Sequence, residues 1–169
     1  MIDPNTLAEI WDAHAERLLL IARSIGGPAE DAVQETFIAL ATQPVLPRDP
    51  MAWMVRVTRN RLLQWQRGNR RRRDREIAVC ELLWFDCDVL SVDQKLDGRE
   101  VTTALLALPS PEREVIVMHL WGDMTFESIA GVIGGSRAAA HRAFGRGLET
   151  LKLKFNRDSE IDSMRLCNE

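Results

Sequence analysis

The sequence predicts an all-α protein made of two small helical domains joined by a linker, and three observations lead to this class. Apolar residues recur at helical spacing along most of the chain, and no segment alternates with a sustained period of two. The 169 residues, 46% of them hydrophobic, suffice for one modest core or two small ones. The apolar pattern weakens in an acidic stretch, which divides the chain into an N-terminal domain 1–76, a linker 77–98, a C-terminal domain 99–157 and a tail 158–169 that we expect to fray.

The first helix is expected over residues 6–25, where a helical apolar face ends at a Gly-Gly pair beginning with Gly26. The predicted inward face consists of Leu7, Ile10, Trp11, His14, Leu18, Ile21 and Ile25.

A second helix should follow Pro28, which suits a first helical turn, and run to about Ala41. Its predicted inward residues are Val33, Phe37 and Leu40. The opposite side carries Asp31, Gln34, Glu35 and Ile38. Such an acidic stripe with one exposed aliphatic residue repels DNA and suits a protein partner that carries arginines, although a plainly solvated face has the same spacing.

The third helix should begin with Asp49 as N-cap and Pro50 in the first turn, and continue through Trp65 before Gly68. One face holds Met51, Val55, Thr58, Leu62 and Trp65. The other holds Trp53, Arg56, Asn60, Gln64 and Arg67, and leads into arginines 70, 71, 72, 73 and 75. Two amides, an indole and many arginines suit phosphate contacts and stacking on unpaired bases, so Arg70 and Arg71 join the candidate site. Packing of Trp53 against a neighbouring helix is the alternative interpretation.

Charge alternates in blocks along the chain, although the formal net charge is only −3. Residues 56–75 hold nine arginines and one acid, and residues 137–157 hold six basic residues and one acid. The stretches 1–35 and 76–112 are acidic. Two separate basic segments favour two footprints on a polyanion, with solvated helix faces as the alternative. The acidic linker could also shield a basic block when DNA is absent.

The C-terminal domain should begin with a helix over 101–108. Ser110 as N-cap, followed by Pro111 and Glu112, predicts the start of another helix that ends at Gly122.

A helix-turn-helix is predicted from Thr125 onward. Thr125 caps its first helix, Ile129 and Ile133 face inward, Gly134 allows the turn, and Ser136 caps the second helix. The buried stripe of that helix is predicted to be Ala140, Phe144, Leu148, Leu151 and Phe155. The candidate DNA-reading residues are Arg137, Ala138, His141, Arg142 and Arg146, as in a recognition helix placed in a major groove. An ordinary helical hairpin is the alternative.

Several functional classes are disfavoured. The longest run without a charge spans only 12 residues, 36–47, which is too short for a membrane helix, and the N-terminus has no secretory signal, so we expect a cytoplasmic protein. Cys80, Cys87 and Cys167 lack metal-ligand or disulfide-framework spacing. With no nucleophile constellation, paired carboxylates or phosphate loop, we expect no catalytic site, metal or cofactor, and therefore no enzyme.

Three segments resemble the small extracytoplasmic-function group of bacterial sigma factors. They are AEDAVQETF at 29–37, AWMVRVTRN at 52–60 and LPSPEREVIVMHLWGDMTFESIAGVIGGS at 108–136. The resemblance covers about residues 18–155. Two such segments in the right order and at the right separation make the resemblance far more specific than one segment alone.

The resemblance implies a mechanism. The first motif would dock on the clamp helices of the largest catalytic subunit of RNA polymerase, with Asp31, Gln34, Glu35 and Phe37 at that interface or supporting it. Trp53, Arg56, Asn60 and Arg67 would contact the minus-ten promoter element, and Arg137, His141, Arg142 and Arg146 the minus-thirty-five element. An anti-sigma factor is also implied.

Two departures from the family pattern concern DNA reading. Gln64 stands where members usually have an aspartate, and Ala139 and Ala140 replace threonine and a β-branched residue in the recognition helix. The alanines remove hydrogen-bonding options and leave more of the affinity to phosphate contacts. Two rival functions remain: a stand-alone helix-turn-helix regulator that binds closed DNA unaided, and an adaptor that binds no DNA.

Overall fold

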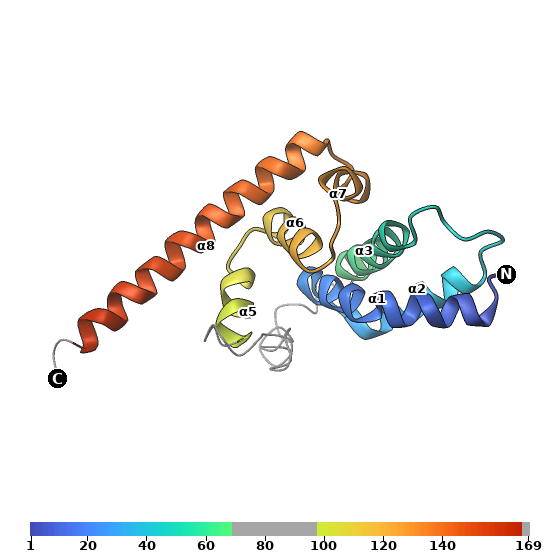
Figure 1. Cartoon of the computed structure of the whole chain (residues 1–169), viewed down its shortest axis with the longest axis horizontal. Coiled ribbons are helices and arrows are strands. Elements are labelled where there is room, and N and C mark those ends of the chain that lie inside the picture. The colour runs from blue at the N-terminus through green and yellow to red at the C-terminus, as the bar shows by residue number, and fades with distance from the viewer. Residues whose placement is uncertain (69–97, 167–169) are drawn as a thin grey trace.

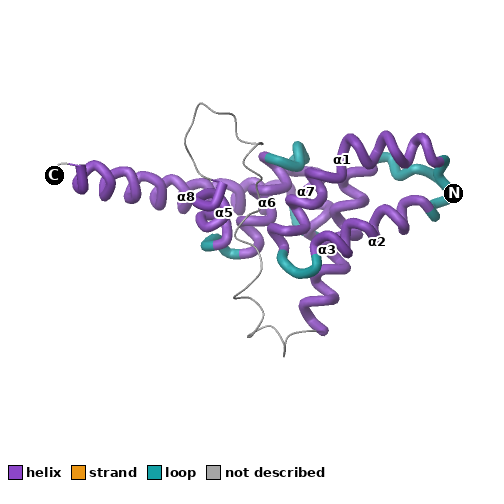
Figure 2. Tube along the Cα trace, turned by 90° about the horizontal axis from the view of Figure 1, so that it is seen from below, coloured by secondary structure: helices purple, strands orange, loops and turns teal. Residues whose placement is uncertain are grey.

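Helices make up nearly all of the described structure, a computed structural model that covers residues 1–68 and 98–166, with the helical backbone alone from 157 onward. Figure 1 shows the N-terminal helices at one end of the molecule and one long helix projecting from the other. The helices are α1 (Pro4–Ile25), α2 (Ala29–Ala41), α3 (Pro50–Gly68), α5 (Gly98–Leu106), α6 (Ser110–Leu120), α7 (Phe126–Ile133) and α8 (Arg137–Leu166). Within these described residues there is no strand, and short loops join the consecutive helices on each side of the undescribed stretch 69–97 (Figure 2). The all-α prediction is confirmed.

The first helix begins earlier than its apolar pattern indicated. Asp3 is the N-cap, because its Oδ1 accepts the backbone N–H groups of Asn5 (3.1 Å) and Thr6 (3.0 Å), and Pro4 occupies the first turn. Gly26 ends the helix with a φ of 87°, a conformation that favours glycine. A side chain from another helix supplies hydrogen bonds at this C-terminus: Gln66 Nε2 of α3 donates to the carbonyl oxygens of Ile25 and Gly26, each at 2.9 Å.

The predicted third helix and its cap are confirmed. Asp49 Oδ1 accepts the N–H of Ala52 at 3.0 Å, and α3 runs from Pro50 to Gly68. Its buried residues are Met51, Met54, Val55, Thr58 and Leu62. The predicted face therefore lacked Met54 and wrongly included Trp65, which is 37% exposed. Trp11 of α1 is likewise 46% exposed and lies against Phe37 with ring centroids 4.6 Å apart, so it covers the edge of the core rather than filling it.

Two buried hydroxyls join α2 to α3. Thr36 Oγ1 donates to the Ala32 carbonyl (2.7 Å) and lies 2.8 Å from Thr58 Oγ1, and both side chains are fully buried. The one Thr36 hydroxyl hydrogen is used by the carbonyl, so Thr58 is the donor to Thr36. This bond fixes the relative position of the two helices that carry candidate sites.

The C-terminal helices differ from expectation in three places. The first is α5, which spans Gly98–Leu106 instead of 101–108. Ser110 is not an N-cap, because α6 is preceded by Pro109 and the Ser110 hydroxyl donates instead to Glu114 Oε1 at 2.6 Å. The α8 helix also continues to Leu166, past residue 157 where the C-terminal domain was predicted to end, and the fraying of the tail stays a prediction.

The N-terminal and C-terminal halves pack together over one continuous apolar core. The core includes Leu18 and Ile21 of α1, Met54 of α3, and Ile116 and Met118 of α6, all fully buried. The contacts run from α1 to α6 and from α3 to α7, and Figure 1 shows α6 and α7 between the N-terminal helices and α8. At Gly122 an added Cβ would lie 2.5 Å from the Met118 carbonyl oxygen and 2.9 Å from Ile21 Cδ1, so this close approach requires glycine.

We predict that Thr58→Val lowers the free energy of unfolding by about 1 kcal/mol, because the hydrogen bond to Thr36 is lost while Thr36 keeps its carbonyl partner. Thr36→Val should cost more, since it leaves the buried Thr58 hydroxyl without this partner. The double variant should cost less than the sum of the two, because no unpaired hydroxyl remains. Denaturant unfolding measures all three values. Thr103→Val, which removes an exposed hydroxyl, is the control, and strictly additive costs would contradict the buried bond.

Candidate functional site

The acidic ridge on α2, made of Asp31, Gln34, Glu35 and Ile38, is exposed as predicted. The Ile38 side chain is 66% exposed, whereas Val33, Phe37 and Leu40 are buried beneath the ridge. Glu35 forms an ion pair with Arg61 of α3, so part of its charge is already neutralised within the molecule. Asp31 and Ile38 are therefore the ridge residues best placed to contact another protein.

The start of α2 has its own ion pair, which lies beside the ridge. Arg23 Nη2 of α1 donates to Glu30 Oε1 at 2.9 Å. This hydrogen bond holds the pKa of Glu30 below its usual range. The pair joins α1 to α2 and leaves the ridge residues themselves unobstructed.

The outer face of α3, made of Trp53, Arg56, Asn60, Gln64 and Arg67, lies on the surface in the predicted order. Trp53 is half-buried and packs against the core, which bears out the alternative interpretation of that residue in part. Arg56 Nη2 donates to the Gly131 carbonyl of α7 at 3.0 Å. Among the described residues, the side chains of Asn60, Gln64 and Arg67 make no hydrogen bond or ion pair. Arg70 and Arg71, the linker and the three cysteines lie outside the described residues.

The helix-turn-helix forms as its capping pattern predicts. Thr125 Oγ1 accepts the N–H of Ser128 (3.2 Å), Gly134 adopts the left-handed conformation with a φ of 77°, and Ser136 Oγ accepts the N–H of Ala139 (3.1 Å). Ile129 is fully buried and Ile133 half-buried. Two local caps and one glycine therefore set the angle at which α8 is presented.

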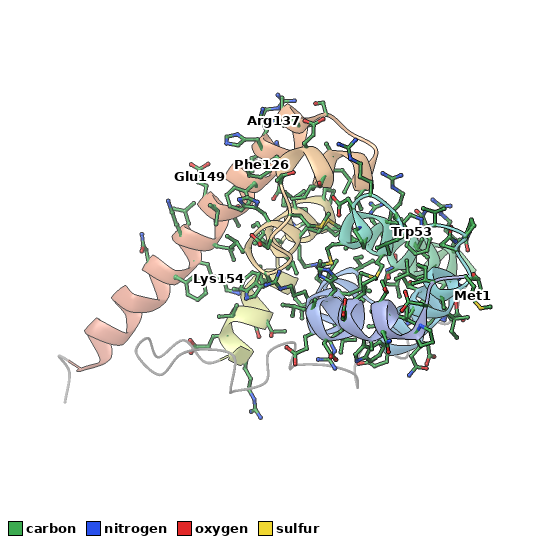
Figure 3. The ribbon with its side chains drawn as sticks, turned by 45° about the vertical axis from the view of Figure 1, so that its right-hand side comes forward. Met1, Trp53, Phe126, Arg137, Glu149 and Lys154 are labelled. Atoms are coloured by element: carbon green, nitrogen blue, oxygen red, sulfur yellow. The ribbon has the colours of Figure 1, made fainter. Side chains whose placement is uncertain are left out.

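The outer face of α8 carries all the predicted reading residues. Arg137, Ala138, His141, Arg142 and Arg146 are exposed. Arg137 stands at the free start of α8 and points away from the bundle (Figure 3). Arg146 Nε is paired with Glu112 Oε1 at 2.8 Å, whereas within the described part of the chain the side chains of Arg137 and Arg142 make neither a hydrogen bond nor an ion pair. Ala140 is fully buried, so its replacement of a larger residue affects packing rather than base reading.

A cluster of ring side chains packs between α6, α7 and α8 of the helix-turn-helix domain. His119 stacks on Phe126 with ring centroids 4.3 Å apart, and its Nδ1 donates to the Met124 carbonyl at 2.8 Å. Phe126 also makes T-shaped contacts with Phe144 and His141, with ring centroids 5.4 and 5.1 Å apart. His141 therefore packs against the fold through Phe126, and the rest of this exposed side chain is available to a ligand.

Sequence reasoning missed a group of buried charges between the two halves. Glu114 is only 2% exposed; its Oε2 lies 2.7 Å from Arg59 Nε, and its Oε1 accepts the Ser110 hydroxyl. Arg113 Nε donates to the Ser24 carbonyl at 2.8 Å, and burial lowers the pKa of this guanidinium. The available signal was Glu114 itself, an acid directly before the apolar run 115–118.

Two kinds of feature are absent from the described residues. No helix among them is both long and apolar enough to cross a membrane. Over those same ranges, His, Cys, Asp and Glu side chains form no group that could hold a metal ion.

Comparison with protein families identifies two segments. Residues 10–72 match Sigma-70 region 2, and residues 98–151 match Sigma-70, region 4. These segments hold the acidic ridge and the α3 outer face in the first case and the helix-turn-helix in the second. The chain is therefore a member of the sigma-70 family of RNA polymerase sigma factors.

Individual relatives narrow the assignment within that family. A probable ECF RNA polymerase sigma factor, SigI of Mycobacterium tuberculosis, is 37% identical over 161 residues, covering 83% of this chain and 53% of the relative. A probable RNA polymerase sigma factor, RfaY of Xanthomonas campestris pv. campestris, is 27% identical over 146 residues, covering 79% of this chain and 35% of the relative. The chain thus spans about half the length of the first relative and less of the second. The first of these relatives is named as a member of the extracytoplasmic-function (ECF) group.

Two solved structures share the fold. The sigma factor RpoE of Bartonella quintana, solved in complex with the anti-sigma factor NepR, superposes with a TM-score of 0.69 at 21% identity, covering 90% of this chain and 95% of that one. CnrH, solved in complex with the cytosolic domain of CnrY, gives a TM-score of 0.61 at 24% identity, with 92% and 91% covered.

We predict that Ser136→Ala destabilises the protein by about 1 kcal/mol, because the first turn of α8 loses its side-chain cap. Thermal unfolding measures the loss, and amide exchange at residues 137–139 locates it. Ser136→Asp keeps an acceptor at the cap and is the matched control. An alanine variant as stable as the parent, with unchanged exchange at these amides, would contradict the capping role.

Proposed function

We propose that the protein is a transcription initiation factor that binds core RNA polymerase through the acidic ridge and promoter DNA through the outer faces of α3 and α8. The observation that carries this proposal is the presence of both sigma regions in one chain, in the family order, with the ridge exposed on α2. The role needs no covalent chemistry of its own and is exerted in the cytoplasm.

The division of labour follows from the chemistry of the three surfaces. The ridge is acidic, so it suits an arginine-bearing polymerase surface and disfavours direct DNA contact. Arg137 and Arg142 are free to hold phosphates, and the adjacent exposed residues of α8 can reach base edges. On α3, amides and arginines beside an indole suit a single strand whose bases have left the stack.

Energetics assign melting to the complex rather than to this chain alone. Unstacking costs a few kcal/mol per base step, and one aromatic contact recovers only about 1–3 kcal/mol. Trp53, which is half-buried, can therefore offset part of one step. The polymerase must provide the rest, so the proposal requires an obligate partner.

An anti-sigma factor is a further proposed partner. Of the two structures that share the fold, RpoE was solved with the anti-sigma factor NepR and CnrH with the cytosolic domain of CnrY. The exposed ridge and α8 face are the surfaces that an inhibitor would have to cover.

The stand-alone regulator remains as a second candidate only because the helix-turn-helix is complete on its own. A stand-alone regulator would leave residues 1–68, which include the ridge, without a role. Transcription with purified core polymerase tests the choice, on promoters found by mapping start sites after overexpression. The initiation factor should give start-site-specific transcripts only when the chain is added. Equal output with and without it would sink the proposal.

We predict that the double variant Asp31→Lys/Ile38→Ser binds core polymerase at least about tenfold more weakly, because it reverses one charge and removes the exposed aliphatic contact. Glu35 is left unchanged because it pairs with Arg61. Fluorescence anisotropy of labelled protein titrated with core, without DNA, measures the affinity.

The matched control is Glu16→Lys, which makes the same charge reversal on an exposed position of α1 outside the ridge. It should bind core as the parent does. If both variants bind with the parent's affinity, while circular dichroism shows both folded, the ridge is not the docking surface.

A further inference from the structure

The seam between the two halves is defined here by Asp49, Arg56 and Arg59 on the α3 side and by Glu114, Ser128 and Gly131 on the α6 and α7 side. Figure 1 shows α3 beside α6 and α7, and residue contacts join α3 to α7. The seam thus brings together a helix predicted to contact the minus-ten element and the domain predicted to contact the minus-thirty-five element.

One buried ion pair lies in the seam. The Arg59 and Glu114 side chains are 20% and 3% exposed, and Nε and Oε2 lie 2.7 Å apart. Exposed ion pairs contribute little, but a carboxylate buried this deeply is strongly destabilised when its partner is removed. The Glu114 carboxylate therefore favours any arrangement of the halves that keeps Arg59 beside it.

Two weaker contacts flank this pair and reach the α3 outer face. Arg56 Nη2 donates to the Gly131 carbonyl (3.0 Å), and the Ser128 hydroxyl donates to Asp49 Oδ2 (3.2 Å). With the seam closed, α7 lies over the first part of α3. The Gly131 carbonyl of α7 then binds the guanidinium of Arg56, which belongs to the α3 outer face. Asn60, Gln64 and Arg67 are further along α3 and stay exposed.

We propose that the seam is an intramolecular clasp: the packed seam keeps the free protein closed as long as the buried Glu114 carboxylate has Arg59 beside it, and the clasp must open before the α3 outer face can take single-stranded DNA. This inference rests on the proposed function only for the identity of the ligand. The closed state itself concerns the chain alone.

The clasp makes an asymmetric prediction about its two charged residues. Arg59→Met alone leaves the Glu114 carboxylate in the seam without its partner and should open the clasp. Arg59→Met/Glu114→Leu replaces the whole pair by apolar side chains, a change that is often neutral or stabilising, and should keep it closed. A second substitution that reverses the effect of the first separates loss of the pair from simple misfolding.

The experiment uses the full chain with its three cysteines replaced by serine and spin labels at Asp12→Cys of α1 and Glu149→Cys of α8, both exposed positions. Pulsed electron paramagnetic resonance gives the distance distribution between the labels. The parent should give one narrow distribution. Arg59→Met should lower the closed-to-open ratio at least about tenfold, equivalent to about 1.4 kcal/mol, and the double variant should restore the narrow distribution.

Glu30→Gln is the matched control, since it breaks an exposed ion pair within the N-terminal half and should leave the distances unchanged. Circular dichroism checks that each variant keeps its helix content. A folded Arg59→Met variant that stays closed, or a parent that already samples a broad distribution, would overturn the clasp.

The effect of the clasp on DNA binding is measured as the affinity of the free protein for a fluorescent oligothymidylate at low salt. The Arg59→Met variant should bind the oligonucleotide at least about tenfold more tightly than the parent. Loss of the Arg59 charge alone would have the opposite effect and weaken binding. If the variant opens without any gain in affinity, the gating part of the proposal is wrong.

Core polymerase binding, measured on the same variants, keeps the two proposals distinguishable. If Arg59→Met opens and no variant binds core, the clasp stands and the proposed function fails. If the parent binds core while Arg59→Met remains closed, the clasp fails and the proposed function stands.

Discussion

A carboxylate enclosed in a protein interior requires a partner, and this requirement on Glu114 restricts how the two halves of the molecule can lie. Its partner, Arg59, comes from a helix 55 residues earlier in the chain, and the apolar core on either side is continuous across the contact. With the halves joined in this way, the acidic ridge on α2 and the outer face of α8 remain exposed, while α7 lies over the start of α3. The surfaces proposed for polymerase and for duplex DNA are thus available in the free protein, and the one proposed for unpaired bases is only partly so.

Local chemistry made much of the fold predictable. Asp49, Thr125 and Ser136 were predicted as caps and act as caps, since each accepts a nearby backbone N–H. Periodicity likewise placed Val33, Phe37 and Leu40 inside and the acidic ridge outside. These features depend on residues within a few positions of one another, so the sequence contains the whole interaction. The ridge and the two basic faces could be proposed for the same reason, although their partners remain proposals.

Tertiary contacts were beyond the reach of such patterns. Ser110 looks like an N-cap, but its hydroxyl serves Glu114, whose burial depends on a helix from the other half. Trp11 and Trp65 fit the apolar faces of their helices, yet each lies where the bundle ends and neighbours no longer cover it. Arg56 was predicted to be available to DNA and is held by the Gly131 carbonyl, an acceptor that no side-chain pattern reveals. Each of these outcomes depends on how helices distant in sequence meet.

The two proposals meet in one claim: core polymerase binds the exposed ridge, and the clasp is open in that complex so that the α3 outer face can take DNA. Hydrogen exchange followed by mass spectrometry, comparing the unmodified protein alone and bound to core without DNA, tests both parts in one measurement. Peptides from α2 should exchange more slowly in the complex, because their exposed side becomes covered. Peptides from α7 and the start of α3 should exchange faster, because they lose each other's cover. Slower or unchanged exchange in α7 and the start of α3, with core bound, would contradict the account.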